Sequence, residues 1–200
     1  KIEFKSSLGN TDFDVIALFD NHVVIVEIKH LVTPYDPKRY YEDRQEIKKA
    51  IKQLKLRKQV LLRDWALIRD ITNGFLPPEP YPEERIIQLV CTNIDSFTSL
   101  EIDGIRIVDE CVLIRFFSDN GQYVKIWSGS KIYKKEKIWE DSQPTIDDFK
   151  RYIASPTAVK WYREVVKRKN ITIPRYGERE YLGTVNYILD EDIVKFDRQI

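Results

Sequence analysis

The stretch that decides the fold is residues 12–29, which read DFDVIALFDNHVVIVEIK. Residues 13–19 carry apolar side chains at the spacing of a β-strand, and residues 23–28 form an almost continuous β-branched run. Between them, Asp20 and Asn21 are typical of a tight turn. These features predict an antiparallel hairpin whose second strand is covered on both faces, as in the middle of a sheet.

A two-residue turn fixes the register of such a hairpin, because opposed residues then lie equally far from the turn. Asp14 is expected opposite Glu27, and Asp12 opposite Lys29. Side chains two positions apart share one face of a strand, so these four charged side chains are expected on one side of the sheet. The other side of the first strand is then apolar, and consists of Phe13, Val15, Ala17 and Phe19.

Glu27 and Lys29 interrupt an otherwise apolar strand, which is costly for a charged group unless it is paired or bound to a metal. Directly opposed carboxylates repel each other, and a divalent cation between Asp14 and Glu27 would remove that repulsion. Oxygen-only ligands of this kind are the ones that Mg²⁺ or Mn²⁺ prefers. The pattern therefore predicts a metal site beside Lys29. The alternative is a partly solvated network of salt bridges at the end of the strand.

The rest of the chain predicts an α/β fold, a mixed central β-sheet flanked by helices. Strands are expected at residues 2–6, 85–92 and 105–117, with a loop at 32–37. A long helix is expected over residues 40–71, because apolar residues recur there at helical spacing. These residues are Ile47, Ala50, Ile51, Leu54, Leu61, Trp65 and Ile68.

Residues 123–200 are interpreted as a mostly helical extension of a core formed by residues 1–122. Short strands are expected within residues 123–133, followed by a helix that Thr145 caps and that continues to residue 153. Ser155 and Pro156 predict the start of another helix, to about residue 169. Substrate recognition, formation of a homodimer and docking of another domain all stay open as roles for this extension.

The residues Asp12-Phe13-Asp14 and Glu27-Ile28-Lys29 resemble the motif of the PD-(D/E)xK nuclease superfamily. This resemblance covers roughly residues 1–117 and implies a restriction-endonuclease-like fold. It implies that Asp14 and Glu27 are metal ligands, that Lys29 is the catalytic lysine, and that Asp12 is at most an auxiliary ligand. The proline of the motif is replaced by Phe13, and the helix with a further acidic ligand, common upstream of the motif, has no counterpart after Lys1.

Many members of this superfamily place a glutamine on the helix that follows the motif. Gln53 flanks the apolar stripe of the expected helix, whereas Gln45 points nearly opposite to it, so Gln53 is the better candidate. Arg57 lies one turn further along as a candidate phosphate contact. The alternative for both glutamines is that they are ordinary polar side chains on the helix surface.

Residues 38–69 carry eleven lysines and arginines against four acidic residues, although the net charge of the whole chain is only +1. Such a basic segment favours contact with a polyanion, and Lys49 and Lys52 are its candidate nucleic-acid-binding residues together with Arg57. An ordinary solvated helix face is the alternative.

The composition predicts a cytoplasmic protein. No apolar run is long enough to span a membrane, and Cys91 and Cys111 give neither a zinc spacing nor a disulfide framework. A chain that opens on Lys1 without a signal-peptide pattern favours a domain excised from a larger protein, with other domains as partners.

Together these patterns predict a Mg²⁺- or Mn²⁺-dependent nuclease that hydrolyses phosphodiester bonds in DNA, as in restriction, defence or repair. Two alternatives stay open. One is a non-catalytic module that retains the nuclease fold and binds nucleic acid or assembles with other proteins. The other is a structural domain whose buried charges pair with one another.

Overall fold

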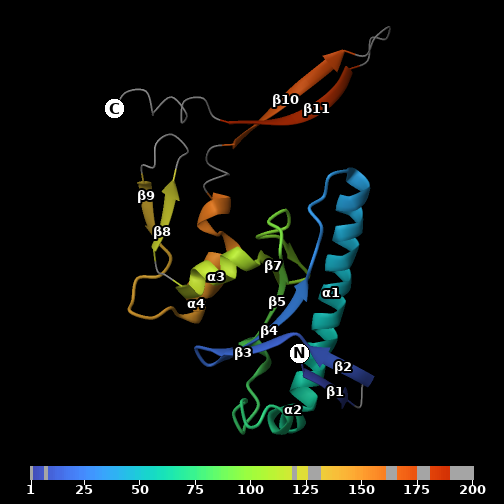
Figure 1. The fold of residues 1–200 in the computed structure, drawn as a ribbon, viewed down its shortest axis with the longest axis vertical. Helices are drawn as coiled ribbons and strands as arrows, with labels where there is room; N and C mark the ends of the chain where they lie inside the picture. Colours follow the sequence, from blue (N-terminus) through green and yellow to red (C-terminus); the bar gives the residue numbers. More distant parts are fainter. Residues whose placement is uncertain are drawn as a thin grey trace. The chain divides into compact units, whose positions relative to one another are not determined.

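The computed structural model describes residues 2–6, 9–118, 121–125, 132–160, 166–174 and 181–189 (Figure 1). The chain divides into two compact units, Lys1–Ser155 and Pro156–Ile200. The boundary expected after residue 122 therefore falls inside the first unit.

The predicted hairpin is present, with β3 (Val15–Phe19) antiparallel to β4 (His22–Lys29). Asp20 and Asn21 have φ angles of 47° and 55°, the doubly positive pattern of the tight turn that suits the twist of paired strands. Phe19 pairs with His22 and Val15 with Val26, so the predicted register is confirmed from the turn as far as Val15.

Beyond Val15 the prediction is wrong, because the expected first strand is broken at Asp14. Its earlier part is β2 (Gly9–Phe13), which pairs with β1 (Ile2–Ser6), so Asp12 lies opposite Glu3 and not opposite Lys29. The break also reverses the alternation of faces. Phe13 is completely buried in the same core as Ile16, and not with its expected companions Ala17 and Phe19.

The central sheet has five strands in the order β3-β4-β5-β7-β6, with β5 at Ile86–Thr92, β6 at Glu101–Ile102 and β7 at Ile105–Asp109. The pairs β4–β5 and β5–β7 are parallel, whereas β3–β4 and β6–β7 are antiparallel. A mixed sheet flanked by helices is thus confirmed, and the fold class is α/β.

Helices cover both faces of this sheet (Figure 1). On one face, α1 (Pro37–Arg63) and α2 (Trp65–Ile71) bury Val23 and Ile25 of β4. On the other face, α3 (Glu110–Ser118) and α4 (Ile146–Ala154) bury Val24 and Val26. The β-branched run of β4 is therefore apolar on both sides because both of its faces are covered. A short 3-10 helix, η1 (Glu83–Arg85), precedes β5.

Two helix boundaries differ from the sequence prediction. The expected long helix starts earlier, at Pro37, because the Asp36 carboxylate accepts the Arg39 N–H and proline suits the first helical turn. It is also interrupted at Asp64, so residues 40–71 belong to two helices. Residues 105–117 are not one strand, because the Asp109 carboxylate accepts the Val112 N–H at 3.0 Å, in the first turn of α3.

The expectation of a mostly helical region after residue 122 is wrong for its described residues. The strands β8 (Gly121–Lys125) and β9 (Ile132–Lys137) form one antiparallel hairpin, in line with the short strands expected nearby. The helix capped by Thr145 is confirmed as α4.

The second unit contains an antiparallel hairpin of β10 (Val166–Pro174) and β11 (Tyr181–Leu189). The prediction of a helix that reaches residue 169 is therefore wrong from Val166 onward. Residues 161–165, also expected in that helix, lie outside the described residues.

Among the residues that the structure describes, no helix combines the length and the apolar character that crossing a membrane requires.

The β3–β4 turn also anchors α4, because the Asp20 carboxylate accepts the N–H of Ile146 at 2.7 Å. We expect Asp20→Ala to lower the free energy of unfolding by about 1–2 kcal/mol, through loss of this cap and of a residue that tolerates positive φ. Asn21→Gly, at the neighbouring turn position, should change it by less than about 0.5 kcal/mol, or raise it, because glycine suits this turn. Urea unfolding measures both variants, and equal losses in the two would contradict this role of Asp20.

Candidate active site

The candidate site lies where β4 ends against α1. Val23 and Ile25 face the α1 side of the sheet, so alternation along the strand carries Glu27 and Lys29 to the same side. Glu27 is only 2 % exposed. The salt-bridge network considered as the alternative to a metal site is present at this strand end, with a buried carboxylate at its centre and partly exposed side chains of Lys29 and Asp12 around it.

Glu27 is neutralised by two cations from two different elements. Its Oε1 lies 2.7 Å from Nζ of Lys29, and its Oε2 is in ion-pair contact with Nη1 of Arg57 on α1. The other terminal nitrogen of Arg57, Nη2, lies 2.7 Å from Oδ1 of Asp12. One buried guanidinium thus joins β4 and β2 to α1.

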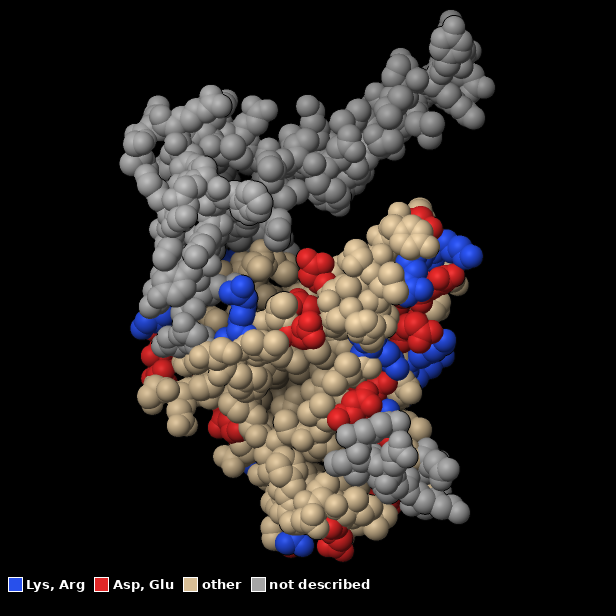
Figure 2. Space-filling view, viewed as in Figure 1, with Lys and Arg blue, Asp and Glu red and all other residues tan. Residues whose placement is uncertain are grey.

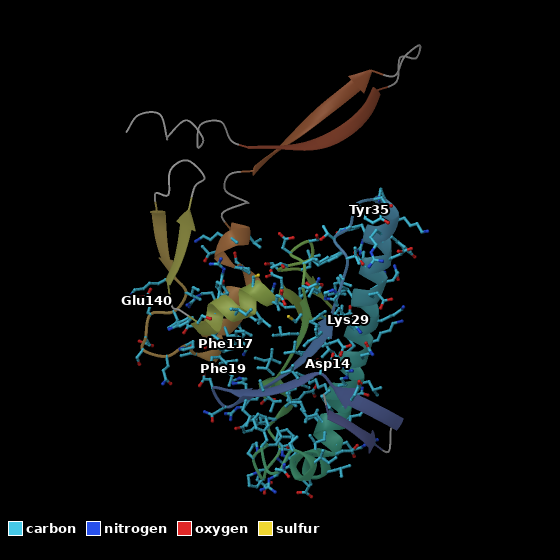
Figure 3. All side chains as sticks on the ribbon, viewed as in Figure 1. Asp14, Phe19, Lys29, Tyr35, Phe117 and Glu140 are labelled. Carbon is cyan, nitrogen blue, oxygen red and sulfur yellow. The ribbon has the colours of Figure 1, made fainter. Side chains whose placement is uncertain are left out.

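Lys29 is held from a second direction by α1. Its Nζ donates a hydrogen bond to Oε1 of Gln53 at 3.0 Å, so the structure brings the predicted glutamine to the predicted lysine. The Lys29 side chain keeps 21 % of its surface exposed, while Glu27 and Gln53 orient its amine. Figure 3 labels Lys29 and Asp14 at the junction of β3, β4 and α1.

Asp14 occupies the bend between β2 and β3 and is half-buried. Its Oδ2 accepts the backbone N–H of Ile28 at 2.9 Å, in place of the strand pairing that ends at Val15. The Asp14 carboxylate is thereby fixed beside the residue that follows Glu27. The structure thus brings Asp14 to the end of β4 through a side-chain hydrogen bond, and not through the extended register expected from the sequence.

Two further residues near the site were missed from the sequence. Asn93, just after β5, accepts the N–H of Leu31 at 2.6 Å and donates to its carbonyl at 3.0 Å, which fixes the chain after Lys29. Glu46 lies two turns before Gln53 on α1, and its pKa is lowered by its hydrogen bond with Lys49 and by the positive charge of Lys29. The seven-residue spacing from Gln53 was the available signal for Glu46.

The three predicted nucleic-acid-binding residues do not lie together. Lys52 is exposed on α1, and Lys49 is exposed with its Nζ 2.6 Å from Oε1 of Glu46. Arg57 is buried in the two ion pairs and is not part of the surface. Figure 2 shows basic and acidic side chains mixed over the α1 side of the molecule.

The donor set suits a hard cation in its chemistry, because Asp14, which accepts the N–H of Ile28, and Glu27, one residue before Ile28, both offer carboxylate oxygens. Mg²⁺ is commonly held by one or two carboxylates, with water and substrate phosphate completing its shell. Within the described part of the chain, no group of three or more His, Cys, Asp or Glu side chains could hold a metal ion. Asp12, expected as an auxiliary ligand, instead contacts Arg57.

Comparison with protein-family models, with curated proteins and with solved structures finds no match. Functional inference therefore depends on the residues of the site and on their geometry. The resemblance to PD-(D/E)xK nucleases stays a prediction from the motif.

Because Glu27 takes part in buried ion pairs, its substitution should lower the free energy of unfolding more than substitution of Asp14 does. We expect Glu27→Gln to lower the free energy of unfolding by about 3 kcal/mol, because Arg57 then keeps a buried charge with one partner fewer. Asp14→Asn should cost less than about 1 kcal/mol, since the amide oxygen still accepts the Ile28 N–H. Chemical denaturation followed by circular dichroism compares the two, and a larger loss in Asp14→Asn would refute this ranking.

Proposed function

We propose that this chain is a divalent-metal-dependent nuclease domain that hydrolyses phosphodiester bonds in DNA. The observation that carries the proposal is Glu27, a buried carboxylate at the end of an apolar strand, in contact with Lys29 while Gln53 and Asp14 flank the same strand end. This set combines two acidic side chains, which would hold a divalent cation, with one oriented amine, which would stabilise negative charge on a phosphate.

Stability alone does not account for such an arrangement. Buried ion pairs lose much of their mutual attraction to desolvation, and apolar replacements are often neutral or stabilising. A sequence that breaks its apolar pattern at one strand end is typical of a functional site. The burial of Glu27 and Arg57, at 2 % and 3 % exposure, therefore supports a role beyond packing.

Asp14 and Glu27 would hold the metal, which supplies Lewis-acid stabilisation and makes water nucleophilic at neutral pH. Lys29, oriented by Glu27 and Gln53, would position the attacking water and stabilise negative charge on the phosphate. Asn93 would keep Lys29 in place by fixing the backbone of Leu31.

A second function is favoured by one specific contact. Arg57 already neutralises Glu27 and Asp12, as a permanent substitute for a metal would. This contact supports a non-catalytic module that keeps the nuclease fold and binds nucleic acid or assembles with other proteins. The two proposals differ in whether a divalent cation binds and in whether DNA is cut.

Cleavage assays separate the two functions. The purified chain should cut supercoiled or linear duplex DNA in Mg²⁺ and not in EDTA, with RNA as a parallel substrate. Lys29→Met should lower the rate about 100-fold or more, because positioned proton-transfer and charge-stabilising groups contribute at least that much. Asp14→Asn should lose activity as well, while it stays folded.

Lys150→Met is the matched control, because Lys150 is exposed on α4, which packs on the opposite face of the sheet. Its activity should equal that of the unaltered chain. Metal-independent DNA binding without cleavage would support the non-catalytic module instead. A chain that neither binds nor cuts nucleic acid would leave the buried charges with a structural role alone.

The exposed lysine of α1 tests contact with DNA phosphates. Lys52→Ala should weaken binding and reduce the slope of log affinity against log salt concentration by about 1, as expected for one lost phosphate contact. Fluorescence anisotropy with a labelled duplex in EDTA measures this, with Lys150→Ala as the control. Identical slopes for both variants would exclude Lys52 from the interface.

A further inference from the structure

We infer that Arg57 is a positioning residue that occupies the Glu27 carboxylate as a substitute for a divalent cation. Arg57 has to release Glu27 before the metal binds. This inference rests on the proposed function, since it concerns the same carboxylates. It assigns to Arg57 an internal role in the site, whereas a phosphate contact was expected from the sequence.

Arg57 contacts two carboxylates at once, as a bound metal cation would. Its two terminal nitrogens reach two carboxylates from different strands, Asp12 on β2 and Glu27 on β4. A guanidinium is always charged and presents its donors in a planar fork, which suits such bridging. The Arg57 side chain is only 4 % exposed, so solvent screens these contacts poorly.

Charge makes the two cations mutually exclusive on Glu27. Asp12, Asp14 and Glu27 face Lys29 and Arg57, which leaves these five side chains with one formal negative charge in excess. A divalent cation on Glu27 would bring two further positive charges against the guanidinium that contacts its Oε2. Like charges repel strongly at short distance in a poorly screened site, so metal binding displaces Arg57.

Asp12 gives Arg57 a place to remain after it releases Glu27. The Asp12 side chain is 31 % exposed, and its carboxylate already contacts Nη2 of Arg57. Arg57 can therefore keep this partner while Nη1 leaves Glu27. On this reading Asp12 favours metal binding through Arg57 and not as a ligand.

The test measures Mn²⁺ affinity of the full 200-residue chain by calorimetry, with folding checked by circular dichroism. Arg57→Gln should bind Mn²⁺ about 10-fold more tightly than the unaltered chain, because Glu27 is no longer occupied. Asp12→Asn should bind it more weakly, because Arg57 then rests on Glu27 alone. In the Arg57→Gln background, Asp12→Asn should have no further effect, whereas a ligand role for Asp12 predicts a loss there too.

A measurement on the unaltered chain covers the case in which Arg57→Gln fails to fold. Titration with Mg²⁺ should shift the side-chain Nε–Hε signal of Arg57 in a ¹⁵N-correlated NMR spectrum until the site is saturated. A folded Arg57→Gln chain with unchanged or weaker affinity would overturn the inference, as would saturation without a shift of the Arg57 signal, and in both cases the metal site would stand. Absence of any Mn²⁺ binding in the folded chain and in every folded variant would reject the metal site and this role of Arg57 together.

Discussion

The carboxylate of Glu27 lies in the interior between β4 and α1, where an unpaired charge would be costly, and the surrounding elements are joined by what neutralises it. Lys29 comes from the same strand and Arg57 from the helix, and Arg57 carries the connection on to Asp12 of β2. The position of α1 on the sheet is therefore constrained by charge at one point and by apolar packing along the rest of its length. Few substitutions at Glu27 satisfy both constraints.

The bend at Asp14 is the second determinant of the site. A strand that continued through Asp14 would have turned Phe13 away from the α1 core and placed Asp12 over Lys29. The bend instead puts Phe13 in that core, and the Asp14 carboxylate takes the N–H of Ile28. Asp14 thus ends the pairing of β3 with β4, reverses which side chains face the α1 core, and provides an acidic group at the residue after Glu27.

Much of the fold could be predicted from the sequence where local signals were strong. Three structures could be predicted from a few neighbouring residues each: the Asp20-Asn21 turn, the strand β4 from its β-branched run, and the start of α4 from the Thr145 cap. Residues 105–117 were misread because a continuous apolar run is compatible with a strand or a buried helix, and the decisive capping contact of Asp109 is a tertiary detail. In the site, helix spacing and the motif singled out Gln53, and a hydrogen bond joins it to Lys29. The ion pairs of Arg57 depend on how α1 packs against two strands, which no local pattern encodes.

The contacts of the site and the anchor of the hairpin turn differ in how far apart their partners lie along the chain. Asp12, Glu27, Lys29, Gln53 and Arg57 all fall within residues 12–57, whereas Asp20 bonds to Ile146, 126 positions later. Closing a short segment costs less chain entropy than closing a long one. All the partners of the charged centre are therefore present once residue 57 has been synthesised, whereas the Asp20–Ile146 hydrogen bond also needs α4. The two ends of the same hairpin thus depend on segments of the chain that are synthesised at different times.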